Sequence, residues 1–226
     1  MPRARAAAQR YGLVITGTTA GPNLVDPEGL DARIARFCDF FRLSVALGSG
    51  LVTGEVKAKP AHVSNGAAWE AVLHAVVAVA RVAAAEGGLF ALEAGPGCFV
   101  RTVADIERVL TAVAHPALRV NFDARNDYVV GDDPVEVVRR LGSHIVHGHI
   151  NDGVRLDAAG AWEARPVGDG AVDHAATLRA LERQGFAGFL CVEHCRSLGE
   201  LEASVSHLRG IHPLEARGRA PADGGA

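Results

Sequence analysis

Four side chains that could bind a metal stand at widely spaced positions of the chain: Glu93, Asp123, His149 and Glu193. Taken singly, an acidic residue at the end of an apolar run is often a helix cap or a solvated loop charge. Three carboxylates that converge with an imidazole would repel one another unless a cation lay between them. Oxygen ligands with one nitrogen suit Mn²⁺, Mg²⁺ or Co²⁺ better than a sulfur-rich zinc site. Four such residues, each after an apolar run, therefore favour a metal site.

The apolar runs that precede these side chains are typical of buried parallel strands. Most are nearly continuous in apolar residues rather than alternating, as expected where helices cover both faces of a sheet. We predict six strands, at Gly12–Thr16, Leu51–Glu55, Gly88–Glu93, Leu118–Asp123, His144–Ile150 and Gly188–Glu193. Stretches of helical periodicity separate them, and we predict helices at Leu30–Leu47, Ala67–Ala85, Thr102–Ala114, Pro134–Leu141, His174–Gln184 and Leu198–Leu208.

This alternation of strands and helices predicts a parallel sheet, either open or closed into a barrel. The polar residues collect at the C-terminal ends of the strands, where barrel enzymes place their active sites. An open nucleotide-binding sheet would instead need a glycine-rich loop after a strand. The segment Gly95–Gly97 lacks the third glycine of such a loop and the helix directly after it. We therefore predict an α/β barrel of the TIM type.

The barrel predicted from the sequence is incomplete, because six β/α units are visible and a closed barrel of this type has eight. We expect the first two units, about 60 residues at typical barrel proportions, to be missing through truncation or a misassigned start. We predict one barrel domain at residues 1–212 and a disordered tail at 213–226, rich in Pro, Gly and Ala. The two sheet edges left exposed would favour a homo-oligomer or aggregation.

Composition excludes several classes of partner. The 226 residues are 49% hydrophobic and 22% charged, which suits one domain with a sizeable core. A formal charge of −3 argues against nucleic acid as a partner. We find no signal peptide and no run of about 18 uninterrupted apolar residues, so we expect no membrane partner. The four cysteines have no CxxC spacing and form no dense framework, so the cytoplasm is the expected location.

Six motifs occur in a characteristic order: Leu92-Glu93, Asn121–Asp123 with Asn126, His147–Asp152, Pro166–Asp173, Gly185–Phe189 and Val192-Glu193. Through them the chain resembles the xylose-isomerase-like TIM barrels, which include sugar and sugar-phosphate isomerases and epimerases. The resemblance extends from about Tyr11 to Leu208. Any single motif would be a weak signal, whereas six in the right order are a specific one.

The resemblance implies one divalent ion, with Mn²⁺ as first choice and Mg²⁺ or Co²⁺ as alternatives. Its ligands would be Glu93, Asp123, His149 and Glu193. The two glutamates would also serve as the catalytic acid and base. Substrate contacts are expected from Arg155, Asn126 and His147. Asn126 stands where several members have a histidine, and His147 shares a strand face with the expected ligand His149.

We therefore predict a metal-dependent isomerase or epimerase whose partner is a small sugar or sugar phosphate. Such an enzyme moves a proton beside a carbonyl through a metal-stabilised enediolate. One alternative is a lyase on the same scaffold, similar to inosose dehydratase or dehydroshikimate dehydratase, which would expel a β-hydroxyl. Another is an inactive truncated remnant. Abasic-site endonucleases share the barrel, but they need more histidine ligands and a basic DNA-binding face, which this chain lacks.

Overall fold

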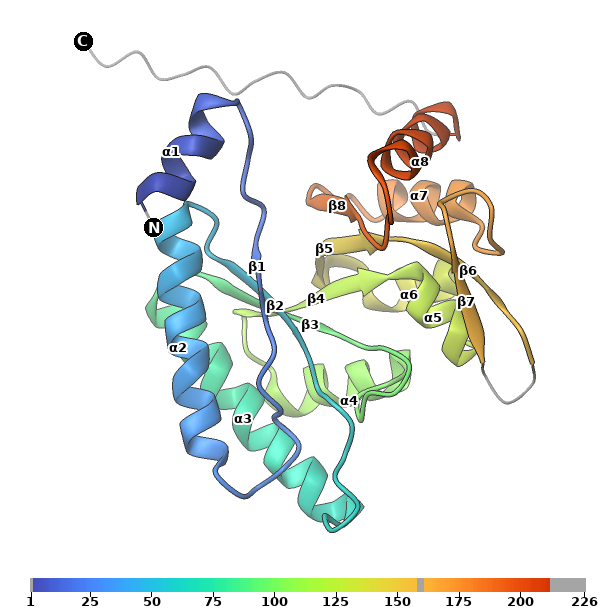
Figure 1. Ribbon diagram of the computed structural model, residues 1–226. Coiled ribbons are helices and arrows are strands. Elements are labelled where there is room, and N and C mark those ends of the chain that lie inside the picture. The colour runs from blue at the N-terminus through green and yellow to red at the C-terminus, as the bar shows by residue number, and fades with distance from the viewer. Residues whose placement is uncertain (1, 158–160, 212–226) are drawn as a thin grey trace.

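The computed structural model describes residues 2–157 and 161–211. Its centre is a six-stranded parallel sheet in the order β1-β2-β3-β4-β5-β8, which curls into an incomplete barrel (Figure 1). The strands are β1 (Thr18–Ala20), β2 (Leu51–Glu55), β3 (Leu89–Glu93), β4 (Leu118–Asp123), β5 (Ile145–Ile150) and β8 (Phe189–Val192). The predicted fold class is therefore confirmed. The tail predicted at 213–226 lies outside the described residues, and the bounds of the domain stay a prediction.

The helices are α1 (Pro2–Arg10), α2 (Leu30–Leu47), α3 (Asn65–Ala85), α4 (Val103–Val113), α5 (Ala124–Val130), α6 (Pro134–Leu141), α7 (His174–Arg183) and α8 (Leu198–Ile211). Apart from α1, which precedes the first strand and packs against α2, the helices come after strands and cover the outside of the sheet (Figure 1). All six predicted helices form, and α2 and α6 have the predicted bounds. Local chemistry explains the ends. For example, Asp133 caps α6, because its side chain accepts a hydrogen bond from the N–H of Val135 and Pro134 is the first residue of the helix.

The first strand differs from the prediction. We predicted it at Gly12–Thr16, but the ladder to β2 forms at Thr18–Ala20, with Thr18 opposite Val52. Leu13 and Val14, inside the predicted strand, are 64% and 70% exposed. A strand exists only where a neighbour accepts its backbone hydrogen bonds. Apolar composition shows where a strand could form, but the register of β2 determines where this one does.

Besides α1, a short helix and a hairpin were not predicted, and both of these lie next to the C-terminal edge of the sheet. The short helix α5 follows β4 directly and ends at Gly131, whose φ is 98°. The antiparallel hairpin of β6 (Asp152–Arg155) and β7 (Trp162–Arg165) follows β5 and forms a separate two-stranded sheet. Both are short, so neither contains enough apolar repeats to give a periodic signal.

The core lies between the sheet and its helices. Phe37 and Phe41 of α2 are fully buried, and the ring of Phe37 packs edge-on against Phe90 of β3 at 5.5 Å. Helix α3 contributes a face of small apolar residues to this core. By length and composition α3 is also apolar enough to cross a membrane, and 44% of the relevant window is buried inside the protein. This burial is typical of a central helix in a globular core.

A buried carboxylate organises the loop that follows the hairpin. Asp152 accepts four backbone N–H groups, those of Gly153, Gly168, Gly170 and Val172. Its Oδ2 also lies 3.3 Å from His174 Nε2, at the start of α7. Burial disfavours the charged form, but the imidazole and the N–H donors outweigh burial and lower the pKa of Asp152. Gly170 is required here, because a Cβ would lie 2.0 Å from the carboxylate.

We expect Asp152→Asn to lower the free energy of unfolding by about 3 kcal/mol at pH 7, because an amide nitrogen replaces one accepting oxygen. Since the pKa of Asp152 is lowered in the folded state, its contribution exists at neutral pH and is lost in acid. The difference between variant and wild type should therefore shrink below about pH 4. Urea unfolding at pH 7 and at about pH 2.5 measures both effects.

The matched control for this prediction is Asp169→Asn in the same loop, where the side chain is exposed. We expect it to change the free energy of unfolding by less than about 0.5 kcal/mol. Equal effects of the two substitutions would contradict the role assigned to Asp152.

Candidate metal centre

Three of the four predicted ligands meet at the C-terminal edge of the sheet. Glu93 ends β3, Asp123 ends β4 and His149 lies near the end of β5. One ligand atom from each residue lies within 4.8 Å of the others. Asp123 and His149 are register partners in the parallel ladder, which explains their proximity. Glu93 and Asp123 are buried, and His149 is half-buried.

The fourth predicted ligand, Glu193, lies beside this group. It follows β8 directly, and its backbone N–H donates to the carbonyl of Ile150 at 3.0 Å. Its Oε2 lies 3.4 Å from His149 Nδ1, while Glu93 Oε2 lies 3.3 Å from the same nitrogen. The imidazole therefore stands between the two glutamates. Glu193 is the more exposed of the pair, with 31% of its side chain accessible against 8% for Glu93.

Three asparagine amides join the carboxylates to one another. Asn151 Nδ2 donates to Glu193 at 2.6 Å and to Asp123 at 2.9 Å. Asn121 Nδ2 donates to Glu93 Oε2 at 2.6 Å, and Asn126 Nδ2 donates to Glu93 Oε1 at 3.0 Å. Both oxygens of Glu93 therefore accept a bond. These bonds fix the carboxylates in place before any ligand arrives.

Sequence reasoning did not assign a role at the site to Asn121 or Asn151. Both stand two residues from a predicted ligand on a strand or at its end, Asn121 before Asp123 and Asn151 after His149. Because side chains alternate between strand faces, that spacing directs both toward the same side as the ligand. The two-residue spacing could thus have indicated that both asparagines face the site. The residue type gave no such indication, because asparagine occurs in many structural roles.

Asp123 combines two roles. Its Oδ1 accepts the N–H of Asn126 at 2.9 Å and so caps helix α5. Burial, and then the charge of Glu93, raise the pKa of Asp123 to about 7. The carboxylate of Asp123 can therefore serve both roles. Its Oδ1 caps helix α5, and its Oδ2 is available as the predicted metal ligand.

The neighbouring carboxylates raise the pKa of the His149 imidazole. Burial alone would lower its pKa, but the hydrogen bond to Glu93 and the charges of Glu93, Glu193 and Asp123 raise the pKa to about 9. Without a metal ion, a proton on this ring is thus the main positive charge among the three carboxylates. A divalent cation would supply the same compensation more strongly, and one imidazole with carboxylate oxygens is a donor set suited to Mn²⁺ or Mg²⁺. The residues fit such an ion.

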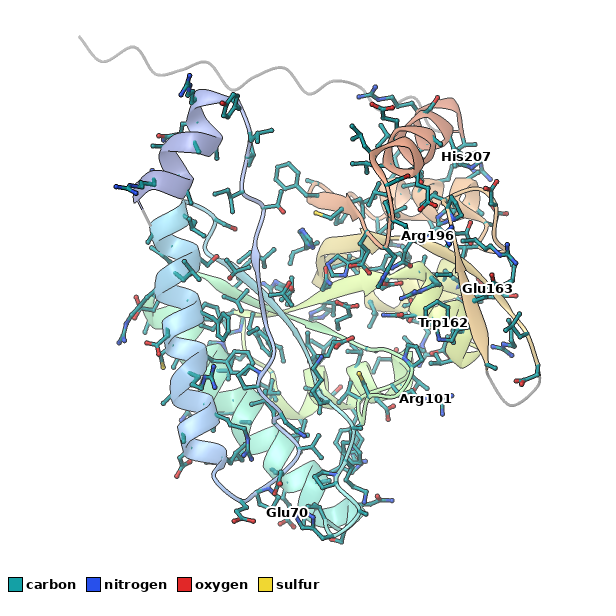
Figure 2. The ribbon with its side chains drawn as sticks, viewed as in Figure 1. Glu70, Arg101, Trp162, Glu163, Arg196 and His207 are labelled. Atoms are coloured by element: carbon teal, nitrogen blue, oxygen red, sulfur yellow. The ribbon has the colours of Figure 1, made fainter. Side chains whose placement is uncertain are left out.

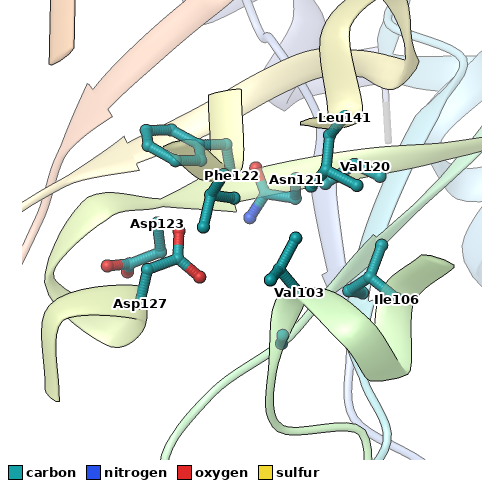
Figure 3. Close-up of a pocket in the computed structure, with 10 residues that line it drawn as sticks. Val103, Ile106, Val120, Asn121, Phe122, Asp123, Asp127 and Leu141 are labelled. Carbon is teal, nitrogen blue, oxygen red and sulfur yellow. The ribbon is translucent and has the colours of Figure 1, made fainter. Parts of the chain in front are cut away.

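A further buried carboxylate lies behind the cluster. Figure 3 shows Asp127 of α5 beside Asp123, next to apolar side chains that include Val103 and Ile106. Burial, and then the charge of Asp123, raise the pKa of Asp127 well above its ordinary value. Its Oδ2 has no hydrogen-bond partner among the described residues. The surroundings of Asp127 therefore favour its neutral form.

The residues predicted to contact substrate lie in three different settings. His147 is buried, and its Nδ1 and Asn121 Oδ1 are 2.7 Å apart. Burial, and then the charge of His149, lower the pKa of His147 to about 4, so the ring is neutral. Asn126 is buried against Glu93. Arg155 points away, because its Nη2 donates to the carbonyls of Tyr128 and Val129 at the end of α5, both at 2.8 Å.

Two of the three residues predicted to contact substrate lie at the ligand cluster, and one does not. Asn126 is in contact with a predicted ligand, and His147 reaches the same cluster through Asn121. Arg155 is occupied in joining the hairpin to α5, and a contact from it to a substrate stays a prediction.

The fold and site can now be compared with known proteins. The family model described as xylose isomerase-like TIM barrel matches residues 2–211. A comparison of the sequence with curated proteins finds no match. Among solved structures, the chain is similar to 3-keto-D-glucoside 4-epimerase from E. coli, with a TM-score of 0.77 and 17% identity over 92% of this chain and 84% of that one.

Two other solved structures are similar to a comparable degree. A probable 3-DHS dehydratase from Bacillus anthracis has a TM-score of 0.76 and 16% identity, over 93% of this chain and 81% of that one. A xylose isomerase-like TIM barrel protein from Mycobacterium smegmatis, in complex with magnesium, has a TM-score of 0.73 and 21% identity, over 92% and 76%. At these identities the likeness shows the fold. Together with the family match over residues 2–211, it establishes that this chain belongs to the xylose isomerase-like TIM barrel family.

Proposed function

We propose that the protein is a divalent-metal-dependent isomerase or epimerase of a small sugar or sugar phosphate. The observation that carries the proposal is the convergence of Glu93, Asp123 and His149 within 4.8 Å, with Glu193 beside them. All four would hold the ion, for which Mn²⁺ is our first choice. The family and its structural neighbours are mostly enzymes, and they include epimerases. A sugar substrate would place the protein in carbohydrate metabolism, and the four free thiols are compatible with the cytoplasmic location that we propose.

The chemistry follows from the two glutamates. A bound divalent ion polarises a carbonyl and stabilises the negative charge that forms when a neighbouring proton leaves. Glu93 receives amide bonds on both oxygens, which hold it in one orientation. Glu193 is more exposed and accepts its amide bond on one oxygen. We assign proton transfer to both, with Glu193 as the group that exchanges its proton with solvent. The amide donors are therefore orienting groups for a carboxylate pair.

A dehydratase is the second candidate, since the expulsion of a β-hydroxyl begins with the same proton abstraction. It is favoured by the similarity to the probable 3-DHS dehydratase from Bacillus anthracis. Incubating the Mn²⁺-loaded protein with ketoses, with inosose and with dehydroshikimate would separate the two activities. A dehydratase produces a conjugated product with a new ultraviolet absorbance, whereas an isomerase or epimerase does not.

We expect Mn²⁺ to bind more tightly as the pH rises. Asp123 holds a proton below about pH 7 and His149 below about pH 9, and a metal ion must displace both protons. The apparent affinity should increase by about tenfold or more between pH 6 and pH 8, with proton release. Titration calorimetry in two buffers of different ionisation enthalpy measures both quantities. Absence of Mn²⁺ binding would instead favour an inactive remnant.

The control for the metal titration is Asp123→Asn, which removes one of the two displaced protons and one charged ligand. We expect weaker binding and a smaller proton release in this variant. An affinity for Mn²⁺ that is the same at pH 6 and pH 8 in the wild-type protein would contradict the assigned ligands.

We expect Glu193→Gln to slow proton exchange at the carbon beside the substrate carbonyl by about 10²–10⁴-fold, because the amide cannot accept the proton. Nuclear magnetic resonance in deuterated water, with a panel of ketoses and their phosphates, follows the incorporation of deuterium directly. Glu202→Gln, on the exposed face of α8, is the matched control and should leave the rate unchanged. Equal rates in wild type and Glu193→Gln would remove Glu193 from the mechanism.

A further inference from the structure

An arginine beside the proposed metal centre has unused hydrogen-bond donors. Arg125 lies in the first turn of α5, two residues after Asp123, and is only 4% exposed. Its Nη2 donates to Asn126 Oδ1 at 2.9 Å. Its Nε and Nη1 are buried, and neither has a hydrogen-bond partner among the described residues. Burying a permanent charge in this way is unfavourable, because the group cannot lose its proton and keeps its need for acceptors.

The surroundings of Arg125 leave its charge without a direct counterion. No carboxylate oxygen within the described part of the chain lies within 4.0 Å of the guanidinium nitrogens. Instead, the guanidinium stacks on the ring of Trp162, with Cζ 4.2 Å from the ring centroid. An aromatic face attracts a cation but accepts no hydrogen bond comparable to that of an oxyanion. The charge of Asp123 interacts with that of Arg125 without a direct contact, but Nε and Nη1 have no acceptor in the described part of the chain.

Arg125 is also directly connected to the proposed metal centre. The amide of Asn126 accepts a bond from Arg125 and donates one to Glu93, so a single side chain separates the guanidinium from the carboxylate. A small substrate held at the metal centre by its carbonyl and hydroxyl oxygens could therefore extend a charged end to Arg125. A neutral hydroxyl could accept a bond from either donor, but only an oxyanion would also compensate the charge of Arg125.

The cover over Arg125 is the hairpin, whose two strands are held unequally. Strand β6 passes closely over the arginine, since a Cβ on Gly153 would lie 3.5 Å from Arg125 Cδ. Arg155 at the end of β6 bonds to the end of α5 and anchors this strand. Strand β7 pairs with β6 along its whole length, and Trp162 is its one residue that is not exposed. Figure 2 shows Trp162 on this outer strand. A rotation of the Trp162 side chain alone would uncover Arg125 and leave the ladder intact.

We propose that Arg125 is the binding group for an oxyanion of the substrate, a carboxylate or a phosphate, and that Trp162 is the cover that moves when the anion binds. The inference rests on the proposed function and narrows its substrate to an acidic keto-sugar, a keto acid or a sugar phosphate. Two observations support the inference: the Nε and Nη1 donors of Arg125 are free, and its Nη2 is hydrogen-bonded to the amide of Asn126 that orients Glu93.

The test uses Trp162 as its own reporter. Trp69 and Trp162 are the two tryptophans of the chain, so Trp69→Phe leaves Trp162 as the single fluorophore. Inorganic phosphate, malonate and neutral glycerol are titrated at constant ionic strength, with and without Mn²⁺. We expect a saturable change in fluorescence with phosphate or malonate and none with glycerol. A stronger response to phosphate indicates a sugar phosphate, and a stronger response to malonate indicates a carboxylate.

In this background, Arg125→Met should weaken the anion affinity by about tenfold or more, because both free donors and the charge are removed. Arg125→Lys should restore part of it. Arg139→Met, on the exposed surface of α6, is the matched control and should bind anions as the parent does. Circular dichroism and thermal unfolding confirm that each variant is folded.

Two results would overturn the proposal: a parent protein whose Trp162 shows no saturable response to either anion, or an Arg125→Met variant that binds them equally well. The proposal is also overturned if the anion response requires Mn²⁺ and persists in Arg125→Met, since the anion would then be bound by the metal. Calorimetry with Mn²⁺ alone tests the proposed metal centre separately. Anion binding without Mn²⁺ still supports the Arg125 site if that centre fails.

Discussion

Carboxylates crowd together at the C-terminal edge of the sheet, and their mutual repulsion must be balanced by the groups around them. Glu93 and Asp123 are buried a few ångströms from each other, and Glu193 lies on the other side of His149. Such a group is stable only if its negative charge is met by donors or cations. Amide donors and one imidazole meet part of that charge, and a divalent ion would meet the remainder.

The supports of this edge come from segments that lie between the strands. Helix α5 is capped by Asp123 and supplies Asn126 and Arg125 to the neighbourhood of Glu93. The hairpin covers α5 from outside, and its first residue, Asp152, binds the following loop through four backbone N–H groups. The ligand carboxylates and their surroundings are therefore one bonded unit, in which an electrostatic change at one residue affects its neighbours.

Much of the site was predictable because a parallel ladder converts sequence position into spatial position. Once Asp123 and His149 are assigned to the ends of adjacent strands, the register places them together. The asparagine donors were not predictable in the same way, since an amide at a strand end has many equally common roles. Arg155 is a different case. The family resemblance implied a substrate contact, which stays a prediction, and the structure shows its guanidinium bound to two carbonyls at the end of α5.

Local patterns were enough to predict the alternation of strands and helices, the barrel-type sheet and the candidate ligands, because periodicity and strand-end chemistry are local properties of the chain. The pairing of the first strand at Thr18–Ala20, the position of α5 and the hairpin beside the site, and the burial of Arg125 against Trp162 became visible only in the folded protein. These features arise from packing and hydrogen bonds between segments distant in sequence. The energies of such contacts depend on geometry that no local pattern records.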